Sequence, residues 1–480
     1  MTKSLKSIFF AIGGIIGLLI LIAVALFLFV DTSAYKPRLE RVASEALGME
    51  VHVGGRLKIA FFSDLHVGLD DVHIRNRGMD IASAKKASLE IALLPLLHKE
   101  VRIKRIGLQH LLISIKRDSN GVFNFEKRKE AKGTFPTLVL DNLSFTDGAF
   151  LYEDEQSGEG FDVGNIKLNV RSLRIAGGNS AEFLKNLSFI AEFACREIRT
   201  KGLMFSDVKF TCKGKDGIFA FNPVTMRLFG GQGSGSIGAD FSGPVPRYSV
   251  YSSLLKFQIE EYLKTLSAKK IAEGSMDFSA SLSMQGNTAK EVKETAGGEV
   301  SLRGENLMLY GNDIDREFTQ FESSQNFNLV DVGAFFFAGP LGLVVTKGYN
   351  FASIFQGSGG SSSIGRLFSD WKVERGIAQA RDVAMATKQN RIALKGRINF
   401  VNERFDDVTI ALIDARGCAR VQQKIHGPFR KPVVEKPSVL MSLAGPALNL
   451  LKQAKDLFTD GKCEVFYTGS VPAPVTTNLR

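Results

Sequence analysis

Residues that build metal and redox centres are scarce in this sequence. Its 480 residues include six histidines, four cysteines and one tryptophan. No Walker A, GxSxG, HExxH or CxxC motif occurs, and no nucleophile stands with its base in a known pattern. We therefore expect no enzyme, no cofactor and no metal site.

Long runs of one charge sign are also missing. The 61 Lys and Arg residues exceed the 50 Asp and Glu residues, but they are scattered instead of forming a stripe. This distribution argues against a nucleic-acid partner and is compatible with a position near anionic lipid. Proline is scarce at 13 residues, whereas the 37 Phe and 47 Gly residues predict strands and turns.

One long uncharged run is present, at residues 8–30, with Lys3 and Lys6 before it and Asp31 after it. A helix that spans a bilayer needs about 20 apolar residues, and positive residues tend to stay in the cytoplasm. We predict a single transmembrane anchor, with the rest of the chain outside. The alternative is a cleaved signal peptide, but its apolar core is usually about 7–15 residues, and no small-x-small site precedes Asp31.

Beyond the anchor, apolar and polar residues alternate. The clearest stretch is 276–285, where Met276, Phe278, Leu282 and Met284 alternate with polar residues. A period of two predicts strands with one apolar face and one solvated face. From the same alternation we assign further apolar-face candidates: Leu111, Ile113, Ile115, Ile166, Leu168, Ile398 and Phe400.

Amphipathic helices are expected in few places: 37–48, 256–272, near Phe318 and part of 438–458. Residues 357–365 are rich in Gly and Ser and predict a loop. These helices are too few to cover a large sheet, so a strongly curled antiparallel sheet could enclose an apolar trough. The predicted fold is mainly β, with an N-terminal transmembrane helix and an elongated hydrophobic groove.

Two short motifs have competing interpretations. Residues 63–68, with Asp64 and His66, resemble the first metal-binding motif of calcineurin-like metallophosphoesterases, but the later motifs of that family are absent. A turn that enters a strand is the favoured interpretation. Residues 233–238 match GxGxxG, but the prolines and strand-like residues that follow predict a turn between strands, not a dinucleotide site.

The four cysteines leave the redox state open. Cys195 and Cys212 flank a predicted strand connection, and Cys418 and Cys463 could pair in the C-terminal part. Four cysteines allow three pairings, and free buried thiols are an alternative.

Several segments together resemble the AsmA family of inner-membrane-anchored periplasmic proteins of Gram-negative bacteria. They include the anchor with Tyr35-Lys36-Pro37, the run Leu93 to Leu97 and the segment Asp118 to Asn124 (DSNGVFN). Asp147-Gly148 and the segment Gly396 to Phe400 are similar to later family segments. The resemblance is most specific over the first 130 residues.

The resemblance implies a relation to the AsmA, TamB and YhdP group and to bridge-like lipid-transfer proteins with a curled, grooved sheet. It implies a single-pass inner-membrane protein whose bulk lies in the periplasm and which moves phospholipid or another acyl lipid toward the outer membrane. Outer-membrane or periplasmic protein partners are compatible with this role. The alternatives are an assembly factor for outer-membrane proteins and, more remotely, a metallophosphoesterase at Asp64 and His66.

The predicted regions are the anchor (1–30), an AsmA-like N-terminal β-rich region (31–130), a middle β-sheet region (131–290) and a C-terminal AsmA-like β-rich region with amphipathic helices (291–480). The family supplies no catalytic residues, so the lipid-groove candidates remain the eleven apolar residues named above.

Overall fold

The computed structural model describes ten parts of the chain: residues 35–61, 64–93, 102–125, 137–176, 182–266, 269–311, 313–316, 318, 359–439 and 465–474. The predicted anchor lies outside them, as does nearly all of the helix predicted within 438–458. Of the helices in the described parts, none has the length and apolarity to cross a membrane. The chain divides into two compact units, Met1–Leu228 with Ser234–Tyr248, and Phe229–Gly233 with Ser249–Arg480.

Unit 1 begins with helix α2 (Tyr35–Leu47), which confirms the helix predicted after the anchor. Leu39 and Ala43, four residues apart, are buried on one face of the helix. The helix ends at Gly48, whose φ of 64° favours glycine. On its polar side, Glu40 accepts a hydrogen bond from the Val53 N–H at 2.7 Å, so the helix covers the strand edge beside it.

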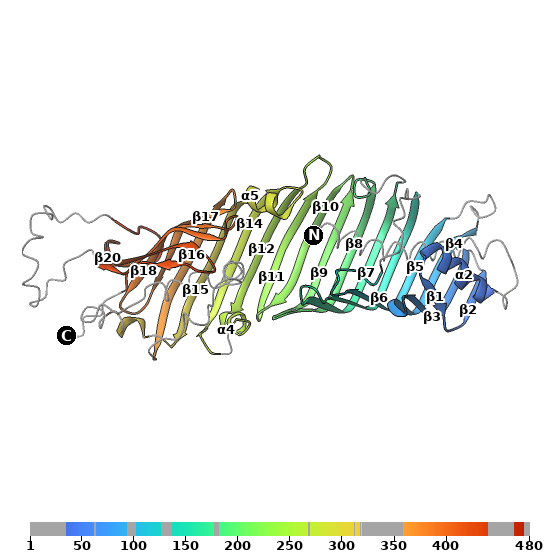
Figure 1. The fold of residues 1–480 in the computed structure, drawn as a ribbon, viewed down its shortest axis with the longest axis horizontal. Helices are drawn as coiled ribbons and strands as arrows, with labels where there is room; N and C mark the ends of the chain where they lie inside the picture. Colours follow the sequence, from blue (N-terminus) through green and yellow to red (C-terminus); the bar gives the residue numbers. More distant parts are fainter. Residues whose placement is uncertain are drawn as a thin grey trace, which may run out of the picture. The chain divides into compact units, whose positions relative to one another are not determined.

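The strands of unit 1 are β1 (Glu50–Val53), β2 (Leu57–Phe61), β3 (Asp64–Asn76), β4 (Met79–Ala92), β5 (Ile103–Arg117), β6 (Leu138–Asp154), β7 (Glu159–Ile175), β8 (Leu187–Thr200), β9 (Leu203–Lys215) and β10 (Ile218–Leu228). The short strands β1 and β2 both pair with β3, and the long strands from β3 to β10 follow one another in the sheet (Figure 1). Strands β11 (Gly231–Asp240) and β12 (Arg247–Gln258) contain the division between the units.

The antiparallel pattern that the sequence predicts has one exception. Strands β5 and β6 are parallel, with Leu108 opposite Phe145 and Arg117 opposite Asp154. Parallel neighbours need a long return connection, and about 20 residues separate the end of β5 from the start of β6. The mostly antiparallel sheet is therefore confirmed, and the all-antiparallel expectation is wrong at this junction.

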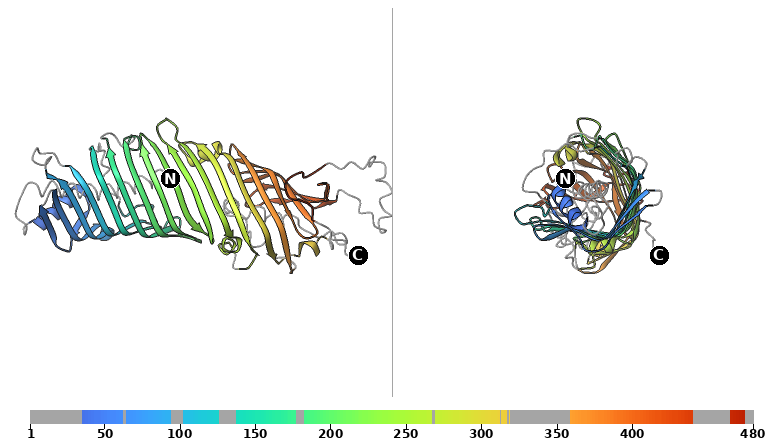
Figure 2. Two further views of the ribbon diagram at one scale, coloured as in Figure 1. Left: turned by 180° about the vertical axis from the view of Figure 1, so that it is seen from behind. Right: turned by 90° about the vertical axis from the view of Figure 1, so that its right-hand side faces the viewer.

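Bulges bend the strands of unit 1 at matching levels. His110, Asp147, Asn165 and Asp207 have φ between 52° and 53°. Asp147 and Asn165 lie at register shifts between β6 and β7, and Asp207 lies at a shift between β9 and β10. An extra residue on one strand bends that strand and increases its twist. Figure 2 shows the strands of unit 1, coloured blue to green, curving along their length.

Unit 2 contains a second run of antiparallel strands: β13 (Ala272–Glu273), β14 (Ser275–Gln285), β15 (Gly297–Tyr310), β16 (Ser361–Glu374), β17 (Ile377–Ala386), β18 (Arg391–Asn399), β19 (Arg404–Ile413), β20 (Ala419–Pro428), β21 (Val433–Val434) and β22 (Ser438–Val439). Two short helices, α4 (Ile259–Leu263) and α5 (Ala289–Thr295), belong to the same unit.

Three local predictions need correction. The helix expected over 256–272 is limited to the five residues of α4, because β12 continues to Gln258. The loop expected at 357–365 is wrong at its end, since β16 begins at Ser361 and Ile364 is fully buried. The glycines at 233–238 lie inside strand β11, not in a turn. In each case pairing with a neighbouring strand overrides the local preference.

Candidate functional site

Strand pairing in unit 1 places apolar residues opposite one another across the whole run from β2 to β10. We call this set the first row: Leu57, Leu69, Ala87, Leu108, Phe145, Leu168, Phe193, Phe210 and Val224. No member is polar. Opposed residues on neighbouring strands point to the same face of the sheet, so the row defines an apolar face of unit 1.

Two further rows extend this apolar face. The second row is Ile59, Val67, Leu89, Ile106, Leu143, Val170, Ala191, Cys212 and Phe221. The third row, beyond the bulges, is Val51, Ile74, Ala82, Ile113, Phe150, Val163, Ile198 and Phe205. Every member of both rows is apolar.

The other face of the same strands is polar. The row between the first and second rows is Lys58, Gly68, Ser88, Gly107, Ser144, Asn169, Glu192 and Thr211. Since neighbours along a strand point to opposite faces, the polar row lies on the outside. The sheet of unit 1 is therefore amphipathic over its full run of strands.

The apolar face is not equally covered along this run. On β3 to β5 its residues are sealed: Leu69 and Leu108 of the first row are each 3% exposed, and Ile106 of the second row is fully buried. On β7 to β10 the first row is only half-buried. We call the following six residues the open stretch: Leu168, Phe193, Ile198, Phe205, Phe210 and Val224.

Side-chain type changes at the same place. Leucine, isoleucine, valine and alanine fill the rows on β3 to β5, whereas phenylalanine enters them from β6 onward. The rings of Phe193 and Phe210 stack with centroids 4.7 Å apart, and those of Phe150 and Phe161 lie 5.5 Å apart. Stacked rings contact each other along the sheet, and Phe193 and Phe210 stay half-buried.

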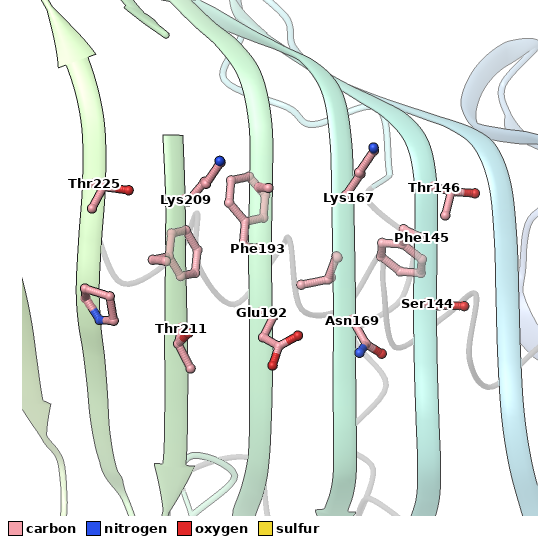
Figure 3. A pocket seen from close by; sticks show the side chains of 14 residues that line it. Ser144, Phe145, Thr146, Lys167, Asn169, Glu192, Phe193, Lys209, Thr211 and Thr225 are labelled. Carbon is pink, nitrogen blue, oxygen red and sulfur yellow. The ribbon is translucent and has the colours of Figure 1, made fainter. Parts of the chain in front are cut away.

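A hollow of about 500 Å³ lies over this part of the sheet, lined among others by Phe145, Leu168, Phe193, Phe210 and Pro223. Figure 3 shows the labelled rings of Phe145 and Phe193 on the two strands that flank the one carrying Lys167 and Asn169. Along β6, Phe145 stands between Ser144 and Thr146, and along β8, Phe193 follows Glu192. The hollow is thus a direct result of the first row.

The predicted groove residues fall into two groups. Leu111, Ile113, Ile115, Met276, Phe278 and Ile398 are buried, each at most 9% exposed. Ile166, Leu168, Leu282, Met284 and Phe400 are half-buried. Within unit 1 the first group belongs to the sealed part, whereas Leu168 is a member of the open stretch and Ile166 adjoins it. Their role as groove residues stays a prediction.

Sequence reasoning missed Phe145, Phe193 and Phe210. Phe189, Ala191, Phe193 and Cys195 recur at every second position along β8, so the period-two signal was present. It could not be read as a continuous row, because the register between strands decides which residues meet.

The remaining chemical groups offer little reactivity. Asp64 is 6% exposed, and its two carboxylate oxygens accept hydrogen bonds from the Lys104 ammonium at 2.8 and 2.9 Å. His66 is exposed on the same strand. In the described parts of the chain, no three His, Cys, Asp or Glu side chains are placed to hold a metal ion.

Cys195 and Cys212 are free, buried thiols. Burial raises the pKa of each to about 11, because the thiolate is poorly solvated there. A thiol with so high a pKa is a weak nucleophile, so these residues act as small apolar side chains of the apolar face. Cys418 is disulfide-bonded, and Cys463 lies outside the described residues.

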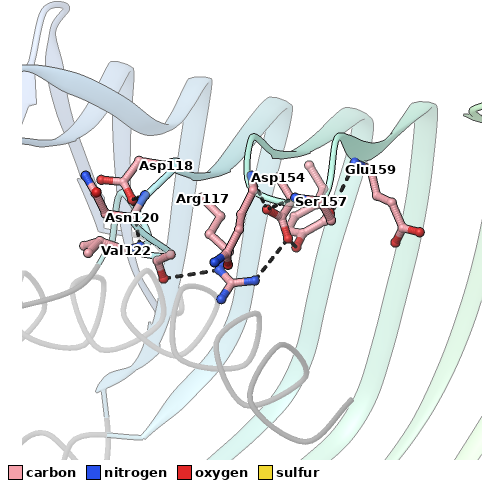
Figure 4. A network of polar contacts seen from close by, with 10 residues as sticks. Arg117, Asp118, Asn120, Val122, Asp154, Ser157 and Glu159 are labelled. Carbon is pink, nitrogen blue, oxygen red and sulfur yellow. Dashed lines mark hydrogen bonds and ion pairs between the residues drawn. The ribbon is translucent and has the colours of Figure 1, made fainter.

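The DSNGVFN segment has a structural role at the end of β5. The Asp118 carboxylate accepts hydrogen bonds from the N–H groups of Asn120 and Val122, at 3.0 and 2.8 Å, which closes a turn. Arg117 donates to the Gly121 carbonyl and to Asp154, each at 3.2 Å (Figure 4). The turn therefore ties together the parallel ends of β5 and β6.

Asp154 is the anion at the centre of this network. Its burial would raise the pKa of the carboxyl, but hydrogen bonds from Ser157, Arg117 and Gln156 outweigh that effect and lower it. The carboxylate is therefore held in its charged form, as a partner for Arg117 and the following turn.

Comparison with known proteins identifies a family for this chain. The model of the AsmA family matches residues 1–183 and 182–331, which together exceed half of the chain. No curated protein and no solved structure matches the chain. The match includes the described part of unit 1 and the start of unit 2.

Proposed function

Because the chain belongs to the AsmA family of bacterial envelope proteins, which are generally non-enzymatic, we propose that it is a lipid-transfer protein of the cell envelope. In this proposal residues 8–30 anchor it in the inner membrane and the bulk of the chain lies in the periplasm. Its cargo is phospholipid or another acyl lipid, and its role is the maintenance of the outer membrane. Transfer is passive and needs no catalytic residue.

The observation that carries the proposal is the open stretch of the apolar face. The first row offers no hydrogen-bond donor or acceptor from a side chain on any of its strands. A bound peptide would leave its N–H and C=O groups unpaired against this wall, at a cost of about 1–3 kcal/mol each. An acyl chain has no such groups and gains about 0.8 kcal/mol per buried methylene.

The dimensions of the open stretch suit one acyl chain. From β7 to β10 there are three strand intervals of about 4.8 Å, or roughly 14 Å in all. Half of a bilayer core of about 30 Å is about 15 Å, which is the depth that one chain fills. An acyl chain that crosses these strands therefore contacts Leu168, Phe193, Phe210 and Val224 in turn. The continuous, elongated groove predicted from the sequence stays part of the proposal.

The redox state of Cys418 supports the proposed location. Disulfides persist in oxidising compartments such as the bacterial periplasm and are rare in the cytosol. The disulfide of Cys418 therefore suits a chain whose bulk has left the cytoplasm. The excess of basic residues suits a position beside anionic lipid headgroups.

The test uses two substitutions on strand β8 that add the same charge to opposite faces. Phe193→Glu places a carboxylate in the open stretch, whereas Ile190→Glu places one on the polar face between Arg171 and Lys213. Each full-length protein is purified in detergent for lipid mass spectrometry, and its transfer of fluorescent phospholipid between vesicles is measured. We expect Phe193→Glu to lose at least tenfold in bound lipid and transfer rate, and Ile190→Glu to match the wild type.

Charges at Ile113 or Phe278 are poorer probes, because these residues are 6% and 9% exposed and a charge there would unfold the chain. If Phe193→Glu folds, binds lipid and transfers it like the wild type, the lipid-transfer proposal fails. The role as a structural or assembly factor for outer-membrane proteins would then be the one that remains.

A further inference from the structure

Unit 2 differs from unit 1 in having buried apolar residues on both faces of several strands. Ala384, Ala393 and Ala411 lie opposite one another on β17, β18 and β19, and none of them is exposed to solvent. They alternate with Met385, Ile392 and Leu412, which point to the other face and are also buried. The alanine row therefore forms a second packed face.

The C-terminal residues 465–474, which we call the strap, cover this alanine row. Tyr467 and Val471 of the strap belong to one buried cluster with Ala384, Ala393 and Ala411. Val471 is fully buried and Tyr467 is 8% exposed. Small side chains on the strands leave the room that these two larger side chains fill.

Polar contacts fix the strap in one position. The Tyr467 hydroxyl donates a hydrogen bond to Asp382 and accepts one from the Val471 N–H at 3.0 Å. The Ser470 N–H donates to the other oxygen of Asp382 at 2.9 Å. Gly469 passes so close that a Cβ there would lie 2.2 Å from the Asp382 carboxylate, so a larger residue would have to displace this carboxylate.

A buried cation also depends on the strap. Arg391 is 7% exposed, and its guanidinium donates to the carbonyls of Val471 and Asp414, at 3.0 and 2.8 Å. The same guanidinium lies 5.5 Å from the centre of the Tyr467 ring. If the strap left, water would have to replace these contacts.

The strap starts beside an oxidised cysteine. Val465 forms a β-bridge with Cys418, and the Gly417 carbonyl accepts hydrogen bonds from the N–H groups of Phe466 and Tyr467 at 2.8 and 3.0 Å. Cys418 itself is disulfide-bonded, whereas Cys195 and Cys212 are free. The single oxidised cysteine of the described residues thus stands where the strap joins the sheet.

We propose that oxidation of Cys418 closes the strap over the alanine row, so that unit 2 is completed only in an oxidising compartment. Two thiols lose two electrons and two protons as the S–S bond forms, and a disulfide oxidant accepts them and becomes two thiols. In the reduced chain no cross-link restricts the ten-residue strap, so ordering it costs more conformational entropy. The strap therefore opens while β16 to β19 stay folded.

The experiment is hydrogen–deuterium exchange with mass spectrometry on the full-length protein in detergent. Exchange of a peptide that contains residues 465–474 is measured in the oxidised protein, after reduction with dithiothreitol, and after reoxidation with glutathione disulfide. We expect reduction to speed exchange of Phe466, Tyr467 and Val471 at least tenfold and reoxidation to restore it. Cys418→Ser should exchange like the reduced protein, and Cys195→Ser with Cys212→Ser should not.

Trp371 provides an internal check on folding, because it is the sole tryptophan of the sequence and is 1% exposed within β16. Its fluorescence should be unchanged on reduction. Equal strap exchange in the oxidised and reduced protein would overturn the proposal. So would a shift of Trp371 emission on reduction, since the disulfide would then hold the whole unit and not the strap.

Discussion

The two parts of the apolar face in unit 1 obey the same alternation but differ in what they leave uncovered. On β3 to β5 branched aliphatic side chains pack into a sealed core, and Ile106 is fully buried. On β7 to β10 the first row carries the stacked rings of Phe193 and Phe210 and stays half-buried. Leu108 and Leu168 have the same side chain and lie in the same row, yet one is sealed and the other half-buried. The difference indicates that what packs over the sheet, and not the strand pattern, decides whether its apolar face is closed.

Unit 2 contains a second closely packed region. One end of each of its strands β17 to β19 is buried on both faces, with alanines on one side and larger residues on the other. Like the β3–β5 part of unit 1, this region is closely packed, and we interpret it as a structural scaffold. The predictions below are ordered by how strongly each change should separate the open stretch from the sealed part.

The largest effect is expected from a charge in the sealed part. Ile106→Asp puts an unpaired carboxylate at a fully buried position of the second row, which should destabilise the chain by about 3–5 kcal/mol. Denaturant titration followed by circular dichroism measures this loss. A loss below about 1 kcal/mol would mean that β3 to β5 are not sealed.

A matched pair of leucines in the first row tests the same boundary more gently. Leu108→Ala on β5 removes a side chain that is 3% exposed and should cost about 2–5 kcal/mol. Leu168→Ala on β7 removes a half-buried one and should cost about 1 kcal/mol, since less apolar area returns to water. Equal losses in urea titrations would contradict the difference between the two parts.

Shape within the open stretch can be changed without adding charge. Phe193→Leu removes the stack with Phe210, which is worth about 0.5–1.5 kcal/mol, and lets the wall relax into the hollow. We expect a small loss of stability and a several-fold loss of bound lipid, measured by mass spectrometry. Phe189→Leu, on the same strand, is the control, and it should retain more lipid.

Acid should weaken the turn at the sealed end of β5. The folded-state pKa of Asp154 is lowered, so its contribution to stability is complete above the unfolded value of about 3.9 and is lost as the pH falls below it. Denaturation midpoints measured from pH 6 to pH 3 should therefore fall less steeply for Asp154→Asn than for the wild type. Parallel curves would show that this carboxylate does not act through its charge.

The smallest effect is expected on the polar face. Ile190→Glu changes a side chain that is 38% exposed and has Arg171 and Lys213 opposite it. Its free energy of unfolding should stay within about 0.5 kcal/mol of the wild type. A larger loss would indicate that the outer face also packs against something.

Much of this architecture could be predicted from the sequence, and the rest depends on contacts between distant residues. Alternation at Leu111, Ile113 and Ile115 predicted an apolar strand face, which β5 confirms. Local spacing also predicted α2. The parallel pairing of β5 with β6 was missed, because nothing in either strand records the direction of its neighbour.

The open stretch shows the same limit from the functional side. Alternation treats Ile113 and Leu168 alike, although one is sealed and the other half-buried. Burial depends on what packs above the sheet, and that is not encoded in the period of a single strand. The family resemblance supplied the expectation of lipid, while register and burial supplied the residues.

The most direct test is to map where an acyl chain touches the protein. Full-length protein is mixed with vesicles that carry a phospholipid with a photoreactive acyl chain, irradiated, digested and analysed by mass spectrometry. The account predicts saturable labelling on β7 to β9, centred on Phe193 and Phe210, and none on β3 to β5. Labelling spread evenly over the polar face, or confined to β3 to β5, would contradict it.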